Sequence, residues 1–226
     1  MPLRKAPAAS RLAVHGLMGA PLRLVAFDFD GTLADSFAVF ARVFEDVARR
    51  FGVRQPGADE VEVLRGLPTR EVLRRLEVPT WRLPALLRFA RTRMAAHAAE
   101  IACVAGMPSL LHRLASRGVI VAVVSSNSES MVRSVLGTSV SAHVHTFRCG
   151  VGLFGKGARL RALMRQYGGP AAFVGDEERD VAAARAARML AIAVTWGYAA
   201  APALRDADAL CTSVTELAER LGSPSA

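Results

Sequence analysis

The sequence predicts an α/β protein: a Rossmann-like parallel sheet covered by helices on both faces, with an all-helical cap inserted after the first strand. Two observations lead to this prediction. Residues 36–103 place apolar side chains at helical spacing. From residue 104 onward, short apolar runs such as Val119–Val124 alternate with amphipathic helical segments. Strands that are apolar along their whole length and separated by helices are typical of a parallel sheet buried on both faces.

The individual elements follow from this periodicity. The apolar run Val25–Phe27 predicts the first strand. Three helices are expected in the cap, one over 37–51 that ends at Gly52, one that begins at 68–69, and one over 83–94. The core continues with helices at 109–116, 129–136, 158–167, 180–187 and 214–221, which alternate with strands at 119–124, 143–147, 171–174, 190–194 and 209–211.

Length and composition bound the organisation of the chain. Its 226 residues are 52% hydrophobic and 22% charged, which is typical of a folded globular protein. The longest apolar runs fall well short of the roughly 20 residues that cross a bilayer, so no membrane partner is expected. We expect a loose tail without a secretory signal at 1–21, an α/β catalytic core at 22–35 and 104–226, and a helical cap at 36–103.

Charge and cysteine content limit which binding partners and which cellular compartment are expected. The net charge is +9, which invites a nucleic-acid interpretation. However, no run of Lys and Arg exceeds two residues and only 6% of residues are aromatic, so we expect no nucleic acid partner. The odd number of cysteines, three with no CxxC, argues against a disulfide framework and favours a cytoplasmic protein. The sequence leaves open a monomer or a homodimer.

Two acids follow the first predicted strand. Asp28 and Asp30 are two residues apart, so in an extended chain their side chains point to the same side. Two carboxylates that close repel each other unless a cation or a shared proton intervenes. The chain has no acidic residue before Asp28. The pair therefore indicates a chemical function at the end of this strand.

Other polar residues fall on the same expected edge, because ligands collect at the carboxyl ends of parallel strands. Ser125, Ser126 and Asn127 follow the strand at 119–124. Asp176 and Asp180 follow the strand at 171–174, and Lys156 precedes a helix on the same rim. Only Lys5 and Lys156 are lysines among 29 basic residues, which indicates a need for a compact ammonium group in mid-chain. Read singly, these residues are also explained as a helix cap, a surface lysine and a first-turn acid.

Taken together and in order, these residues resemble the four motifs of the haloacid dehalogenase superfamily. The motifs are Asp28-Phe29-Asp30-Gly31-Thr32-Leu33, Ser125, Lys156, and Gly175-Asp176 with Asp180. The resemblance covers about residues 22–221 and is strongest to phosphoglycolate-phosphatase-like members, which insert a helical cap after the first motif. It implies a magnesium-dependent phosphatase that hydrolyses a small phosphorylated metabolite, phosphoglycolate-like or a sugar phosphate, through an aspartyl-phosphate.

The resemblance also implies a role for each residue. Asp28 is the expected nucleophile, and Asp30 the general acid and then the base. Mg²⁺ is expected on Asp28, the backbone carbonyl of Asp30 and Asp176, with Asp180 acting behind these ligands or through water. The phosphate is expected to contact a set of four residues, Ser125, Ser126, Asn127 and Lys156. Two departures stand out: Gly157 replaces a common proline, and Glu177 adds negative charge near the metal.

The substrate is expected to be selected by the cap. The segment Arg65–Arg70 resembles the cap loop that reaches over the site in this family. We therefore name Arg65, Gly66 and Arg70 as specificity candidates, with the hypothesis that Arg70 or Arg65 meets an anionic group of the substrate.

Three alternatives remain open at this point. A phosphomutase would return the phosphate from Asp28 to a sugar. A nucleotide-binding protein would use the loop Gly150–Lys156, which matches GxGxxG, although Gly157 lacks the hydroxyl that a P-loop needs. A partner-binding domain would keep the fold without catalysis. His143 and His145 alternate on one predicted strand, and we expect them to be structural.

Overall fold

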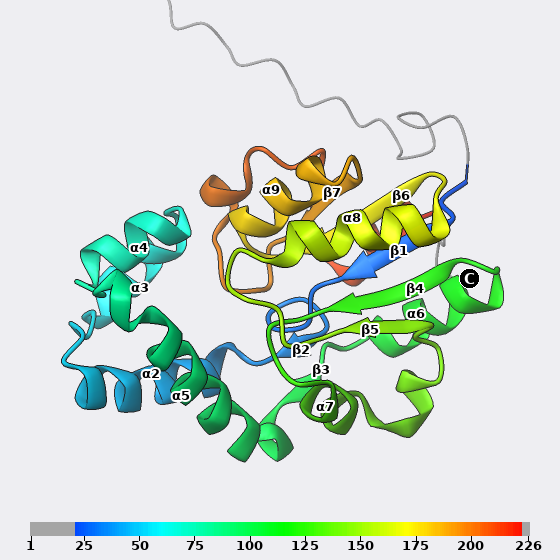
Figure 1. Ribbon diagram of the computed structural model, residues 1–226. Helices are drawn as coiled ribbons and strands as arrows, with labels where there is room; N and C mark the ends of the chain where they lie inside the picture. The colour runs from blue at the N-terminus through cyan, green and yellow to red at the C-terminus, as the bar shows by residue number, and fades with distance from the viewer. Residues whose placement is uncertain (1–20, 223–226) are drawn as a thin grey trace, which may run out of the picture.

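The computed structural model describes residues 21–222, and it confirms the predicted α/β fold (Figure 1). The prediction of a tail at 1–21 lies outside the described residues, apart from residue 21. Six parallel strands form the main sheet in the order β5-β4-β1-β6-β7-β8. They are β1 Leu24–Phe27, β4 Ile120–Val124, β5 Thr146–Arg148, β6 Ala171–Gly175, β7 Leu190–Val194 and β8 Ala209–Cys211.

The centre of the sheet determines which loops meet. Strand β1 pairs in parallel with β4 on one side and with β6 on the other, so that Phe27 lies level with Val123 and Val174. Since all three strands point the same way, the loops after them emerge side by side at the carboxyl edge of the sheet. Segments that are about 150 residues apart in sequence meet there, as the register of β1 with β6 shows.

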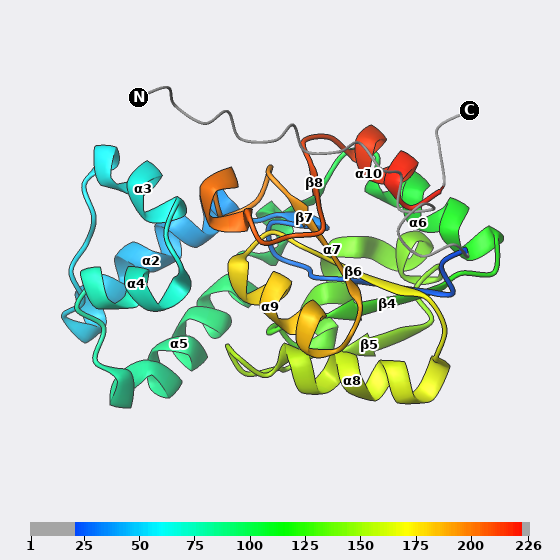
Figure 2. The same ribbon diagram turned by 90° about the horizontal axis from the view of Figure 1, so that it is seen from above.

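Helices cover both faces of the sheet, because successive strand residues point to opposite sides. Leu24 and Ala26 of β1 belong to one apolar core, and Val25 and Phe27 belong to the other. Figure 2 shows the two helix layers with the sheet between them. The first layer contains α8 Lys156–Tyr167 and α9 Glu178–Ala186, and the second contains α6 Met107–Ser116, α7 Glu129–Ser141 and α10 Val214–Arg220.

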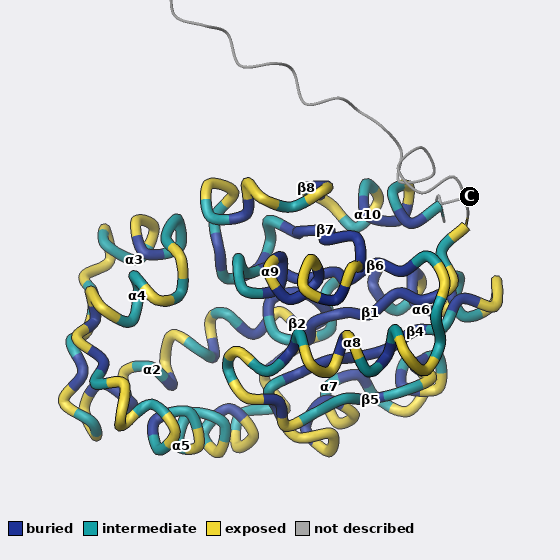
Figure 3. The backbone as a smooth tube through the Cα atoms, turned by 45° about the horizontal axis from the view of Figure 1, so that its top comes forward, coloured by how far each residue is buried: buried dark blue, intermediate teal, exposed yellow. Residues whose placement is uncertain are grey.

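A helical insertion separates β1 from β4 and lies beside the sheet (Figures 1 and 2). Its helices are α2 Phe37–Phe51, α3 Ala58–Arg65, α4 Thr69–Arg75 and α5 Leu83–Ala96. Where the chain enters and leaves the insertion, β2 Ala34–Asp35 and β3 Ala102–Cys103 form an antiparallel pair. Figure 3 shows buried backbone concentrated in the central strands, while the insertion carries more exposed residues.

The sequence did not predict α3 or the β2–β3 pair. Only Leu64 is buried in α3, and its N-cap, Gly57, has no side chain to signal a helix start. The paired strands are two residues each, too short for a visible alternation. Two other elements begin at positions that differ from the prediction. Helix α8 begins at Lys156 rather than at residue 158, and β5 begins at Thr146 rather than at residue 143.

The two histidines before β5 contact residues of α6 and β4. The ring of His143 lies against that of His112, with centroids 4.7 Å apart. The Nδ1 atom of His145 accepts the backbone N–H of Val121 at 3.3 Å. Neither histidine belongs to a group of possible metal ligands among the described residues. A search of the same residues found no helix with the length and apolar character needed to cross a bilayer.

Candidate active site

Asp28 lies at the end of the central strand, and its backbone N–H donates to the carbonyl of Val174 in β6 at 2.8 Å. Lys156, the first residue of α8, places its Nζ 2.6 Å from Oδ2 of Asp28 and 2.6 Å from Oδ1 of Asp180. All three side chains are buried, with at most 5% of each exposed. The strand end, the start of α8 and the first turn of α9 therefore bring together three of the predicted residues.

Burial dominates the electrostatics of this triad. Desolvation raises the pKa of Asp28 to about 7, although the Lys156 ammonium opposes the rise. For Lys156, burial disfavours the charged form, but the carboxylates of Asp180 and Asp28 outweigh it and raise the pKa. The lysine therefore stays charged at neutral pH, and one ammonium group is shared by two carboxylates.

Asp30 contacts neutral donors rather than a cation. Its Oδ1 accepts the hydroxyl of Ser36 at 3.1 Å, and its Oδ2 accepts the side-chain amide of Asn127 at 2.7 Å. Burial raises the pKa of Asp30. This rise in pKa favours the protonated form of the carboxyl, which is the form that a general acid needs.

The loop after β4 aims Asn127 at Asp30. The hydroxyl oxygen of Ser125 accepts the backbone N–H of Asn127 at 3.0 Å, which closes the turn. Ser125 and Asn127 are buried, and Ser126 between them is half-buried. The hydroxyl proton of Ser125 remains available for donation, whereas the amide of Asn127 is bound to an acid. Sequence reasoning had not anticipated this contact.

Asp176 is fully buried at the end of β6. Its Oδ1 accepts the hydroxyl of Thr32 at 2.9 Å, and its Oδ2 accepts the backbone N–H of Tyr198 at 2.7 Å. Desolvation, then the charges of nearby acids, raise the pKa of Asp176 well above its usual range. Gly31 and Gly197 pack directly on this carboxylate, since a Cβ would lie 2.2 Å from its Oδ2 at Gly31 and 2.3 Å at Gly197.

A further acid joins the site. Among the described residues, Asp28, Glu177 and Asp180 each place a carboxylate oxygen within 4.8 Å of the others, close enough for the three to hold one metal ion. Glu177 also forms an ion pair with Arg179 and caps α9 together with Asp180. The sequence predicts that Glu177 adds negative charge near the metal and leaves open whether it is a ligand. The sequence feature that indicates a ligand role for Glu177 is its position between Asp176 and Asp180.

The donor set fits a divalent cation. Five carboxylates lie in this region, and among residues 21–222 only Lys156 and Arg179 form ion pairs with them. The raised pKa values of Asp28 and Asp176 reflect this shortage of positive charge as well as burial. Hard carboxylate oxygens are the ligands that Mg²⁺ prefers. The five are Asp28, Asp30, Asp176, Glu177 and Asp180.

The helical insertion contacts the core around this site. Arg65 donates from Nε to the carbonyl of Tyr198 at 3.0 Å and from Nη2 to that of Gly197 at 2.9 Å. Gly66 follows it as the C-cap of α3. Arg70 is exposed, with its guanidinium 5.7 Å from the ring centre of Phe154. The predicted cap segment therefore reaches the core, and Arg65 is engaged with backbone carbonyls.

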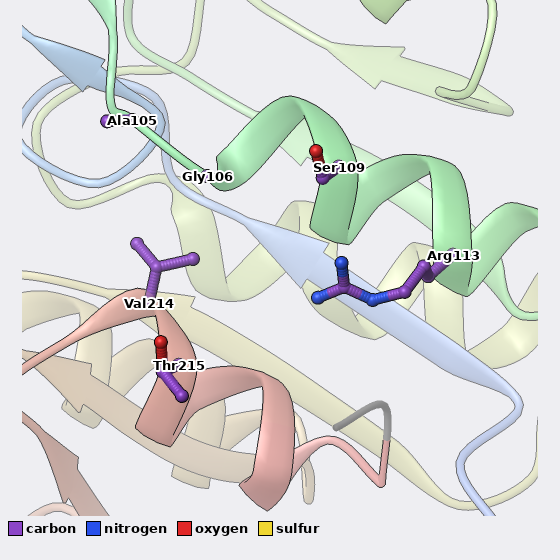
Figure 4. Close-up of a pocket in the computed structure, with 6 residues that line it drawn as sticks. All are labelled: Ala105, Gly106, Ser109, Arg113, Val214 and Thr215. Atoms are coloured by element: carbon purple, nitrogen blue, oxygen red, sulfur yellow. The ribbon is translucent and has the colours of Figure 1, made fainter. Parts of the chain in front are cut away.

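A cavity of about 460 Å³ between α6 and α10 is separate from the acidic cluster. Figure 4 shows Arg113 extending from α6 toward the space between the two helices. Ser109 and Thr215 also line the cavity, and none of the predicted site residues does. The chemistry implied by the acids must therefore take place at the carboxyl edge of the sheet.

Comparison with known proteins agrees with this geometry. The model of the haloacid dehalogenase-like hydrolase family matches residues 25–194. The phosphoglycolate phosphatase of Synechococcus elongatus is 30% identical over 181 residues, which are 78% of this chain and 85% of that protein. The solved structure of protein tyrosine kinase A from Mycobacterium tuberculosis is 27% identical, with a TM-score of 0.68 over 89% of this chain and 99% of that one.

A more distant solved structure shares the fold. CbbY from Rhodobacter sphaeroides, in complex with phosphate, is 23% identical with a TM-score of 0.66, over 87% of this chain and 96% of that one. The family match covers most of the chain and contains the residues of all four motifs. The chain therefore belongs to the haloacid dehalogenase-like hydrolase family, as a phosphatase similar to phosphoglycolate phosphatase that acts as a phosphoric monoester hydrolase.

Proposed function

We propose that this phosphatase hydrolyses a small phosphorylated metabolite, phosphoglycolate-like or a sugar phosphate, with Mg²⁺ and an aspartyl-phosphate on Asp28. The observation that supports this most directly is the buried lysine between two acids. Lys156 holds Asp28 at 2.6 Å and keeps the carboxylate next to a cation that can also attract a phosphate. The substrate class is supported by the relative named phosphoglycolate phosphatase.

The reaction has two steps on this chain's residues. In the first, a carboxylate oxygen of Asp28 bonds to phosphorus, the ester P–O bond breaks, and Asp30 gives its proton to the leaving oxygen. In the second, a water oxygen bonds to the phosphorus of the aspartyl-phosphate, the P–O bond to Asp28 breaks, and Asp30 takes the water proton. Inorganic phosphate leaves, and both acids return to their starting states.

The phosphate and the metal would be held by residues of the loops after β1, β4 and β6 and by the first residue of α8. Ser125 would donate its free hydroxyl proton, Ser126 its turn amide and Lys156 its ammonium to phosphate oxygens, beside Asn127. Asp28, Glu177 and Asp180 would offer oxygens to Mg²⁺, together with Asp176 and the carbonyl of Asp30 that the family resemblance implies. When bound, the cation supplies positive charge that offsets the repulsion between carboxylate and phosphate.

We further propose that the helical insertion selects the substrate. Residues 36–103 act as a cap on a core formed by 22–35 and 104–226. Because Arg65 is engaged with core carbonyls, Arg70 is the better candidate to meet an anionic group. Arg70→Ala should raise KM for a carboxylate-bearing substrate and leave p-nitrophenyl phosphate little changed; equal effects would remove this role.

We further propose that the enzyme is cytoplasmic, that it is a monomer or a homodimer, and that it binds no nucleic acid. The three cysteines are free thiols, which suits a reducing compartment. Size-exclusion chromatography with light scattering would determine the oligomeric state.

The test is a panel of phosphorylated metabolites, assayed for phosphate release with Mg²⁺ and with EDTA. Asp28→Asn should abolish turnover, while Asp35→Asn, an exposed acid in the same segment, should not. Borohydride reduction of an acid-quenched reaction should convert residue 28 to homoserine, detectable by mass spectrometry. Phosphate release by the Asp28→Asn variant at the wild-type rate would refute the proposal. Turnover that requires a sugar bisphosphate primer would indicate a mutase.

A further inference from the structure

Tyr198 reaches the proposed general acid through a single hydroxyl group. Its phenol oxygen lies 3.0 Å from Oγ of Ser36, and that oxygen lies 3.1 Å from Oδ1 of Asp30. Ser36 is fully buried. Tyr198 follows β7, more than 160 residues from Ser36, so the chain of hydroxyls exists only in the folded protein.

Ser36 does not use its hydroxyl as a serine in its position normally would. It is the N-cap residue of α2, yet its side chain accepts no helix amide. Ser128 and Ser213, the N-caps of α7 and α10, do accept amides, from Met131 and Glu216. Such a cap is worth about 1 kcal/mol, so placing this hydroxyl at Asp30 forgoes stability. The placement therefore indicates a function other than capping the start of a helix.

Contacts with the core and with the helical insertion both hold Tyr198 in place. The backbone N–H of Tyr198 donates to Asp176, and its carbonyl accepts Arg65 of the insertion. Its ring lies against Phe37 and Phe40 of α2, with centroids 5.4 and 5.1 Å apart. The position of the hydroxyl thus depends on the acidic loop of the core and on the packed insertion together.

We infer that Tyr198 is a positioning residue for Asp30, acting through Ser36. The inference rests on the proposed role of Asp30 as the general acid. Ser36 donates to Oδ1 of Asp30, and the hydrogen bond between Ser36 and the phenol of Tyr198 fixes the rotation of the Ser36 hydroxyl. Asn127 donates to the other carboxylate oxygen, so both oxygens of Asp30 are held in place.

The test uses two leaving groups, because proton donation matters only where the leaving oxygen is basic. The alkoxide of 2-phosphoglycolate needs a proton, whereas p-nitrophenolate does not. With kcat/KM as the measure, Tyr198→Phe should lower hydrolysis of 2-phosphoglycolate about tenfold and that of p-nitrophenyl phosphate less than twofold. Ser36→Ala should show the same selectivity, and the double variant should lose little more than either single one.

Matched controls separate positioning from folding. Tyr167→Phe removes the other tyrosine hydroxyl of the chain, and Ser213→Ala removes a true helix cap; both should keep the wild-type ratio of the two substrates. Thermal melting should show that Tyr198→Phe is folded. Equal losses on both substrates, or no loss on either, would overturn the inference. A wild-type enzyme that releases phosphate from neither substrate and from no member of the metabolite panel with Mg²⁺ would instead overturn the proposed function, and the role of Tyr198 with it.

Discussion

Replacing Lys156 by methionine tests the buried ion pairs at the centre of the site. The substitution keeps an unbranched apolar side chain but removes the ammonium that lies 2.6 Å from both Asp28 and Asp180. Removing one partner of a buried ion pair costs about 3 to 5 kcal/mol, because the remaining charge is left without compensation. Here two carboxylates lose the same partner, so the cost should fall in the upper part of this range.

Protonation of Asp28 limits that cost and makes it depend on pH. Burial raises the pKa of Asp28 from 3.8 to about 7, and a difference of this size corresponds to on the order of 4 kcal/mol. An acid with a higher pKa in the folded state holds its proton more tightly there, so stability falls as pH rises from 3.8 through about 7. Without Lys156 the folded pKa of Asp28 rises further, which extends the fall to higher pH.

The assay is urea unfolding of the metal-free protein in EDTA, followed by circular dichroism at pH 5 and pH 8. Relative to wild type, Lys156→Met should lose clearly more free energy of unfolding at pH 8 than at pH 5. Arg159→Met, at an exposed position of the same helix, should lose little at either pH. A loss for Lys156→Met that is equal at both pH values, or below about 1 kcal/mol at pH 8, would refute the reasoning.

Three further results are expected. Because Mg²⁺ binds ionised carboxylates, it should raise the melting temperature more at pH 8 than at pH 5.5, as scanning fluorimetry would show; the opposite order would argue against an acidic metal site. Asp28→Asn should leave the metal-free protein at pH 8 at least as stable as wild type while abolishing phosphatase activity, because burial disfavours the ionised form of Asp28 and Lys156 keeps Asp180 as its partner; a large drop in the urea midpoint would contradict this. Gly197→Ala should reduce kcat at least 100-fold, because its Cβ would lie 2.3 Å from Oδ2 of Asp176, whereas Gly57→Ala, with open space around it, should not.

Local patterns in the sequence determined the sheet and much of the site. Apolar runs and helical spacing are set by neighbouring residues, so β4, β7 and α2 were predictable, and with them the fold class. The carboxyl ends of parallel strands share one edge, so the approach of Lys156 to Asp28 followed from the order of the motifs. Helix α3 and the β2–β3 pair were not predicted, because they contain too few buried residues to give a hydrophobic periodicity in the sequence.

Which atoms meet was decided only by the tertiary structure. Thr32 donates to Asp176 across 144 residues, and Ser36 meets Tyr198 across 162, separations at which no local pattern records a contact. The same packing binds Arg65 to core carbonyls and brings Glu177 into the acidic cluster. Chain order specified which residue types reach the edge of the sheet. Side-chain partners depend on long-range packing, which assigned each buried donor and acid its neighbour.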